Sequence, residues 1–126
     1  MRAVDTNVIV RLIVRDDPQQ TAAAERLVEK GAWVSTPALA EAVWALDSVY
    51  GLAPSELARM IEMLVRHRDL VIEDSATVTQ ALTLFRTRPA LGFPDCLMLE
   101  LARKAGHVPL GTFDRSLGKI GGAQRI

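Results

Sequence analysis

The sequence predicts a single α/β domain, an α/β/α sandwich with a mostly parallel central sheet of about four to five strands and helices on both faces. Two observations predict this class. Short apolar runs alternate along the chain with longer segments in which apolar residues recur at helical spacing. The length of 126 residues, without an internal repeat or a long linker, is that of one domain covering residues 1–126.

The N-terminal elements are predicted from turn residues and apolar spacing. Residues 2–4 form a short apolar strand. A polar triplet separates this strand from a helix over residues 8–14, for which Thr6 is the expected cap. An amphipathic helix then covers residues 19–30 and ends at Gly31.

The rest of the chain continues the alternation of strands and helices. A strand over residues 33–35 precedes a helix that Thr36 should cap, with Pro37 in its first turn and Gly51 at its end. The remaining elements are predicted in this order: a fourth helix from Pro54, a strand over 70–72, a fifth helix from Ser75 through Arg86, a sixth helix opened by residues 93–95 and closed by Gly106, and a strand over 108–110.

Four carboxylates are candidates for a shared site: Asp5, Glu41, Asp95 and Asp114. Asp5 follows the first strand and Asp114 follows residues 110–113, and ligands of parallel sheets collect at the carboxyl ends of strands. Asp95 lies in a first helical turn, where the helix dipole favours a charged carboxylate, although an ordinary helix-start acid would also lie there. Glu41 has mainly apolar neighbours but lies opposite the apolar stripe of its helix, so an exposed surface position stays open.

The residue types favour a hard divalent metal ion. Carboxylates brought together repel one another unless a cation neutralises them. Mg²⁺ and Mn²⁺ prefer oxygen ligands and keep bound water, which suits hydrolysis of phosphate esters. His67 and His107 have no partners at zinc-ligand spacing, and Cys96, the only cysteine, is expected to be a packed thiol.

In their order along the chain, four segments resemble those of the PIN domain ribonucleases and, among these, of the VapC-type toxins of toxin–antitoxin pairs. The segments are Asp5-Thr6-Asn7, Glu41 in the helix from Thr36-Pro37, Phe93-Pro94-Asp95-Cys96-Leu97, and Thr112-Phe113-Asp114. The resemblance implies a PIN-like fold and an endoribonuclease dependent on Mg²⁺ or Mn²⁺, which as a toxin would inhibit translation. It further implies that the four carboxylates are catalytic and bind the metal, and that Thr6, Asn7 and Thr112 orient ligands or water.

The resemblance also implies partners. Family members usually form homodimers, and a cognate antitoxin occupies a groove near the active site. Trp44, Met60 and Met63 lie off the main apolar stripes and are candidates for a protein interface. One departure from the family pattern is Gly92, which stands where an acid or amide often precedes the third carboxylate.

The charge distribution permits RNA binding without demanding it. The formal charge is zero, yet outside the four candidate acids 11 acidic residues remain against 15 Lys and Arg. The candidate phosphate contacts are Arg11, Arg15, Arg86, Arg88 and Arg115. Charged residues interrupt every apolar run, and the start lacks the pattern of a signal peptide, so we expect a cytoplasmic protein that does not bind membranes.

Four other functional interpretations compete with a toxin ribonuclease. A haloacid-dehalogenase-like phosphatase also begins with a strand ending in Asp-Thr, but Asn7 stands where that chemistry needs a second aspartate. A receiver domain would need its acidic pair directly after the first strand, and here Asp16-Asp17 follow the first helix. An inactive binding module would have lost one of the four acids, whereas an RNA-processing PIN nuclease would keep them all.

Overall fold

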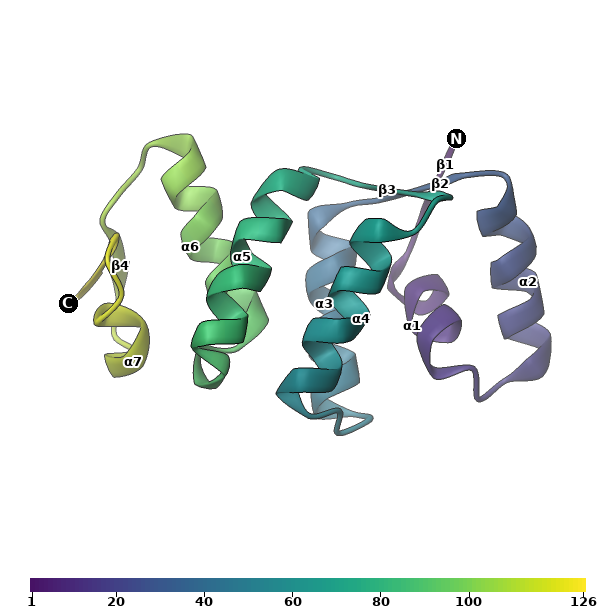
Figure 1. The fold of residues 1–126 in the computed structure, drawn as a ribbon, viewed down its shortest axis with the longest axis horizontal. Helices are drawn as coiled ribbons and strands as arrows, with labels where there is room; N and C mark the ends of the chain where they lie inside the picture. The colour runs from purple at the N-terminus through teal and green to yellow at the C-terminus, as the bar shows by residue number, and fades with distance from the viewer. The chain divides into compact units, whose positions relative to one another are not determined.

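Strands and helices alternate through the computed structural model, which describes all of residues 1–126 (Figure 1). The elements are β1 (Arg2–Val4), α1 (Thr6–Val14), α2 (Pro18–Glu29), β2 (Ala32–Val34), α3 (Thr36–Ser48), α4 (Pro54–Arg66), β3 (Leu70–Ile72), α5 (Ser75–Thr87), the 3-10 helix η1 (Pro89–Leu91), α6 (Phe93–Ala105), β4 (Leu110–Thr112), α7 (Arg115–Gly118) and β5 (Ala123–Arg125). Two compact units divide the chain: the N-terminal unit, Met1–Ser75, and the C-terminal unit, Ala76–Ile126.

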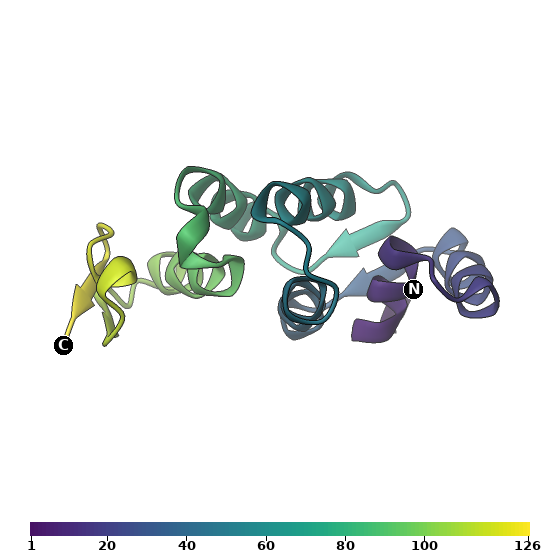
Figure 2. The same cartoon turned by 90° about the horizontal axis from the view of Figure 1, so that it is seen from below.

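The N-terminal unit is built on a parallel sheet in the order β1-β2-β3. Val4, Val34 and Ile72 stand in register across it and are buried. Because side chains alternate across a strand, the neighbouring row contains Ala3, Trp33 and the exposed Val71. Helix α4 packs beside β3, as Figure 2 shows, while α1 packs against both α2 and α3.

The core of the N-terminal unit comes from the apolar faces of its helices. Ile9, Leu39, Leu46 and Ile61 are almost fully buried and come from α1, α3 and α4. Leu39 and Leu46 recur on α3 at a spacing that places them on the same side of the helix. Because α1 packs against α3, the start of α1 lies close to residues on α3.

The C-terminal unit is built on helices and a parallel β4-β5 pair. Phe85 of α5 and Phe93 of α6 meet edge to face with ring centroids 6.1 Å apart. Arg103 of α6 donates a hydrogen bond to the carbonyl of Gly121, which links α6 to the turn before β5. Helix α7 lies tightly against β5, since a Cβ placed on Gly118 would come within 2.8 Å of the Cβ of Arg125.

The structure confirms the predicted α/β class with parallel strands. It corrects the single sheet of about four to five strands, since three strands form one sheet and two form another, and it corrects several element boundaries. Thr6 was the expected cap of the first helix, but Asp5 caps it, since its carboxylate accepts the Val8 N–H. Likewise Ser35, and not Thr36, caps α3 by accepting the Ala38 N–H. In both cases adjacent residues are able to cap, and the backbone path selects the earlier one.

The other corrections concern the strands and the C-terminus. The second strand is Ala32–Val34, one residue earlier than predicted. The predicted strand over 108–110 lies at Leu110–Thr112, after Pro109, which has no N–H to donate to a neighbouring strand. Sequence patterns did not predict η1 or α7, because three or four residues are too few to show a helical period. They did not predict β5 either, because Ala123-Gln124-Arg125 is not an apolar run. None of the helices combines the length and apolar character needed to cross a bilayer.

Candidate functional site

The four candidate carboxylates occur as two clusters, one in each unit. The N-terminal cluster consists of Asp5, Thr6 and Glu41, and the C-terminal cluster consists of Asp95, Thr112 and Asp114. Each cluster contains two acids and one threonine. Within either unit, no group of three or more His, Cys, Asp or Glu side chains is placed to hold a metal ion.

Asp5 lies directly after β1, at the carboxyl end of the strand, as the sequence predicted. Its backbone is extended, with φ −90° and ψ 178°, and its Oδ1 accepts the Val8 N–H at 3.3 Å. Capping therefore holds the Asp5 carboxylate at the positive end of α1, where the helix dipole favours its charge. The side chain itself is exposed.

Glu41 is exposed on α3, opposite the buried face that contains Leu39, Val43 and Leu46. Helical spacing predicted that Glu41 lies opposite this face, but it did not decide between a site residue and an ordinary exposed glutamate. The structure adds that the Thr6 hydroxyl donates a hydrogen bond to Glu41 Oε2 at 2.8 Å. The Glu41 carboxylate is thus held beside the residue that follows Asp5, across 35 positions of sequence.

Asn7, the third residue of this segment, is exposed on the other side of α1 from this contact. It lines a hollow of about 300 Å³ between α1 and α2, together with Arg11 and Leu27 among others. Thr6 and Asn7 were predicted together as residues that orient ligands or water. Only Thr6 contacts one of the candidate acids.

Asp114 caps α7 just after β4, where Leu117 donates its N–H to Oδ1 at 2.8 Å. The Thr112 hydroxyl accepts the N–H of Asp114 at 3.0 Å and so fixes the backbone between strand and helix. Thr112 therefore orients a candidate acid through its backbone. The placement of Asp114 after a strand agrees with the sequence prediction.

Asp95 is half-buried in the first turn of α6, where the sequence placed it. Burial, and then the negative charge of Asp114, raise the pKa of the Asp95 carboxyl above its ordinary value. The two carboxylates are therefore near enough for electrostatic repulsion, although they come from different elements. A bound cation would remove this repulsion.

The donor set of both clusters fits a hard divalent ion. Carboxylates and threonine hydroxyls supply only oxygen atoms, the ligand type that Mg²⁺ and Mn²⁺ prefer. Zinc has no comparable set: Cys96 is buried, and burial together with Asp95 and Glu100 raises the pKa of its thiol to about 11. The prediction that Cys96 is a packed thiol is confirmed, because a thiol with that pKa is a poor ligand and a poor nucleophile at neutral pH.

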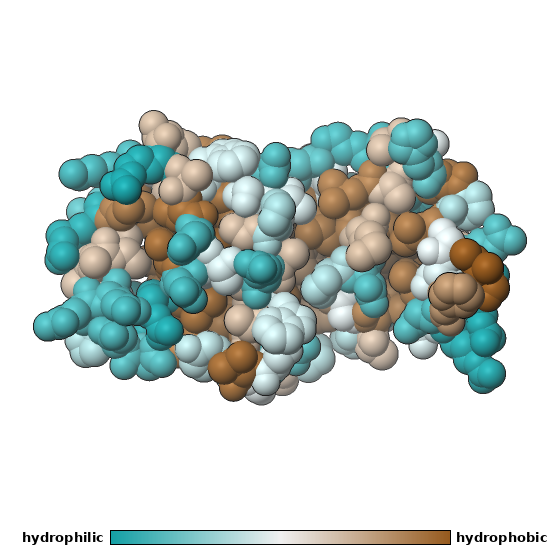
Figure 3. All heavy atoms as spheres, turned by 180° about the vertical axis from the view of Figure 1, so that it is seen from behind, coloured by the Kyte–Doolittle hydropathy of each residue, from teal (hydrophilic) through white to brown (hydrophobic).

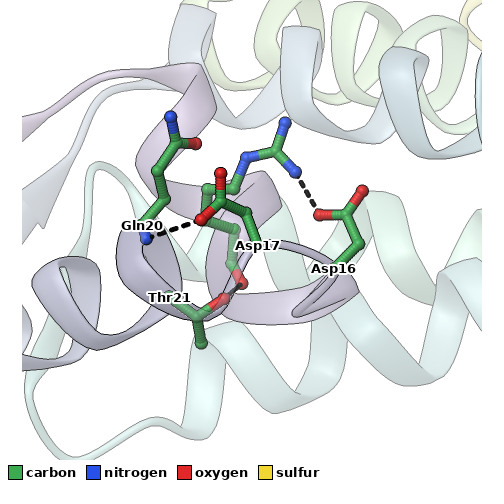
Figure 4. A network of polar contacts seen from close by, with 5 residues as sticks. Asp16, Asp17, Gln20 and Thr21 are labelled. Carbon is green, nitrogen blue, oxygen red and sulfur yellow. Dashed lines mark hydrogen bonds and ion pairs between the residues drawn. The ribbon is translucent and has the colours of Figure 1, made fainter.

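Two of the five candidate arginines are paired within the N-terminal unit. Arg11 forms an ion pair with Asp16, which Figure 4 marks by a dashed line. Hydrogen bonds to Asp16 and then to Tyr50 raise the pKa of Arg11. Arg15 forms an ion pair with Glu25 at 2.6 Å. The first contact joins α1 to the loop before α2, and the second joins the C-terminal end of α1 to α2. Both compete with any phosphate.

The other three candidate arginines, Arg86, Arg88 and Arg115, are exposed residues of the C-terminal unit. Of the candidate interface residues, Trp44 is 60% exposed and Met63 43% exposed, whereas Met60 is half-buried. Tryptophan and methionine are more frequent at protein interfaces than on the rest of the protein surface. Trp44 and Met63 are therefore the stronger interface candidates.

Sequence reasoning missed three residues near Asp114. Phe113 is 80% exposed, Arg125 pairs in register with Thr112, and Lys119 caps the end of α7. An aromatic residue inside a polar loop is a signal that the sequence offered for Phe113. No local pattern indicates Arg125, because Ala123-Gln124-Arg125 is not an apolar run.

Comparison with known families supports the prediction of a PIN fold. The sequence matches the PIN domain family over residues 2–123. PIN domains are α/β/α folds that are generally nucleases and generally use divalent metal ions. Searches of curated proteins and of solved structures found no match.

Proposed function

Because this chain belongs to the PIN domain family, we propose that it is a divalent-metal-dependent endoribonuclease that cleaves phosphodiester bonds of RNA. Its catalytic and metal-binding residues are Asp5, Glu41, Asp95 and Asp114. The observation that carries the proposal is the match to the PIN family over residues 2–123, and the hydrogen bond that holds Glu41 beside Asp5 through Thr6 supports it. Burial and the charge of Asp114, which raise the pKa of the Asp95 carboxyl, agree with it. Carboxylates held in mutual repulsion are an arrangement typical of a site that binds a cation.

The side chains around the acids have separable tasks in this mechanism. When bound, Mg²⁺ or Mn²⁺ supplies a water of lowered pKa and offsets charge on the phosphate. Thr6 holds the Glu41 carboxylate by its hydroxyl, and Thr112 holds the backbone of Asp114. The caps at Val8 and Leu117 occupy Oδ1 of Asp5 and of Asp114. Each aspartate keeps Oδ2 available for other contacts.

We further propose that the nuclease is the toxin of a toxin–antitoxin pair and acts in the cytoplasm to inhibit translation. The ordered VapC-like segments support this role. The exposed Trp44 and Met63 support a homodimer or an antitoxin contact. A short neighbouring reading frame for a DNA-binding antitoxin is expected, and its absence would favour an RNA-processing nuclease.

The decisive experiment incubates the purified chain with total transfer RNA in Mg²⁺, in Mn²⁺ or in chelator, and maps the cut ends. Cleavage should require the metal and should disappear in Asp95→Asn. The matched control is Asp17→Asn, because Asp17 caps α2 by accepting the Gln20 N–H and belongs to neither cluster. Unchanged cleavage by Asp95→Asn would contradict the proposed site.

A negative result divides into two cases. If the folded wild-type chain cuts no transfer, ribosomal or messenger RNA with either metal, calorimetric titration with Mg²⁺ separates them. Binding of Mg²⁺ that Asp95→Asn abolishes would indicate a nuclease with a narrower RNA target. Absence of binding would instead support an inactive binding module.

A further inference from the structure

The loop between β4 and α7 presents an aromatic ring directly beside a candidate acid. Phe113 lies between Thr112 and Asp114 and is 80% exposed, more than any other large apolar residue in the chain. Burying a phenylalanine is favourable by about 1.5–3 kcal/mol, so such exposure calls for a partner. The ring is one of only six aromatic residues in the protein.

The C-terminal unit that carries this loop is basic. It contains seven Lys and Arg and three Asp and Glu, a formal charge of +4. Two of the three acids are Asp95 and Asp114, and the third, Glu100, pairs with Arg103 at 3.1 Å. Apart from the candidate acids, the unit therefore has no Asp or Glu side chain that is not already paired.

Three of these cations lie around the loop. Arg125 stands in register with Thr112, and its Cβ would be 2.8 Å from a Cβ on Gly118. Arg115 follows Asp114 at the start of α7, and Lys119 caps the end of that helix. All three side chains are exposed, and none forms an ion pair. In Figure 3, apolar and hydrophilic side chains lie side by side at the C-terminal end of the chain, on the right.

We propose that this loop binds unpaired RNA: Phe113 stacks on a base, and Arg115, Lys119 and Arg125 bind the neighbouring phosphates. The proposal rests on the proposed ribonuclease function and specifies its substrate as a single-stranded or looped segment. Bases offer their faces to an aromatic ring only where they are unpaired, and phosphates attract exposed cations in any sequence context. A double-stranded RNA would satisfy the cations but not Phe113.

The first test measures binding without catalysis. A fluorescent single-stranded oligoribonucleotide is titrated with the full chain in chelator, and its anisotropy is recorded. Phe113→Ala should weaken binding by between about 5-fold and about 150-fold, the range for one base stacked on an aromatic side chain. Phe113→Tyr should restore binding, because it keeps the ring.

Two controls make this test specific. Met98→Ala truncates another exposed apolar residue of the same unit, on α6, and should leave the affinity unchanged. A blunt duplex of the same sequence should bind equally well to the wild type and to Phe113→Ala. Equal loss in Phe113→Ala and Met98→Ala, or no loss in either, would overturn the stacking role.

The second test concerns the phosphates. The logarithm of the binding constant falls with the logarithm of the salt concentration, with a slope of about −0.7 for each phosphate contact to a single strand. Arg115→Gln, Lys119→Gln and Arg125→Gln should each reduce this slope by about 0.7. Arg59→Gln, a surface change on α4 of the other unit, should not. Slopes identical to wild type in all four variants would overturn the phosphate contacts.

Cleavage and binding together separate this inference from the proposed function. If the wild type cuts RNA and Phe113→Ala binds and cuts RNA equally well, the inference fails while the nuclease stands. If binding depends on Phe113 and the three cations but the protein neither cuts RNA nor binds Mg²⁺, the inference stands and the nuclease fails.

Discussion

The two units each carry two candidate acids but have opposite charge and hold their acids differently. The N-terminal unit has twelve Asp and Glu against eight Lys and Arg, a formal charge of −4, whereas the C-terminal unit has +4. In the N-terminal unit the Thr6 hydroxyl donates a hydrogen bond to the Glu41 carboxylate. In the C-terminal unit the charges of Asp95 and Asp114 repel each other. A hydrogen bond therefore orders an acid in the N-terminal unit, whereas burial and like charge act on the acids of the C-terminal unit.

The largest expected effect tests whether both units serve one reaction. Asp5→Asn and Asp114→Asn, made separately, should each reduce cleavage by at least about 1,000-fold, about 4 kcal/mol in activation free energy. Asparagine preserves both caps, so the melting temperature should stay near that of the wild type. Single-turnover cleavage of a mapped RNA provides the measurement. Full activity in either variant would assign the reaction to the other unit alone.

The next effect concerns the packing of the C-terminal unit. In Gly118→Ala the new methyl group would lie 2.8 Å from the Cβ and 3.1 Å from the backbone nitrogen of Arg125. Backbone cannot yield easily, so we expect a loss of about 1–3 kcal/mol in the free energy of unfolding. Urea denaturation measures it.

The matched control for that change is Gly121→Ala in the turn that follows, where nothing lies within 4 Å of the added Cβ. Its free energy of unfolding should change by less than about 0.5 kcal/mol. Equal values for the two variants would mean that α7 does not depend on close contact with β5.

A smaller effect tests the hydroxyl that holds Glu41. Thr6→Val should weaken Mg²⁺ affinity by about 10-fold, as expected when a group that orients a metal ligand is lost. Thr6→Ser keeps the hydroxyl and should bind Mg²⁺ like the wild type. Titration calorimetry compares the two, and Glu41→Gln should weaken binding at least as much as Thr6→Val. An unaltered isotherm for Glu41→Gln would place Glu41 outside the metal site.

The helix caps at Asp5 and Asp17 allow an effect on stability to be distinguished from an effect on cleavage. Asp5→Ala removes the acceptor of the Val8 N–H and should cost about 1 kcal/mol in the free energy of unfolding, and Asp17→Ala should cost a similar amount at α2. Only Asp5→Ala should also abolish cleavage. Loss of cleavage in both variants would attribute the effect of Asp5→Ala to instability.

The smallest expected effect is the pH dependence of the metal-free protein. Because the pKa of Asp95 is raised in the folded state, its ionisation opposes folding, and stability is lost as pH rises through the raised value. Asp95→Asn should therefore gain stability relative to the wild type above that pH and not below it. The carboxyl is partly exposed, so screening limits the gain to about 0.5 kcal/mol or less. Thermal unfolding across a pH series in chelator measures the difference, and a gain already present in acid would have another cause.

Much of the fold was predictable because its elements are determined locally. Pro54 opens α4 and Gly106, with a positive φ of 80°, ends α6 as the sequence predicted. The caps were predicted one residue late at α1 and α3, because Asp5 and Thr6, like Ser35 and Thr36, are both able to cap. Helix α7 was missed because four residues show no helical period, and strand β5 was missed because Ala123-Gln124-Arg125 is not an apolar run.

The four candidate acids, their placement after strands or in helices, and the membership of a nuclease family came from the sequence by itself, because capping, apolar spacing and ordered motifs are local properties of a chain. The tertiary structure alone decided which groups meet: Thr6 with Glu41, Asp95 with Asp114, and Arg125 with Thr112. Such contacts depend on how apolar faces pack between distant segments, and that packing determines the distances on which hydrogen bonds and charge repulsion depend.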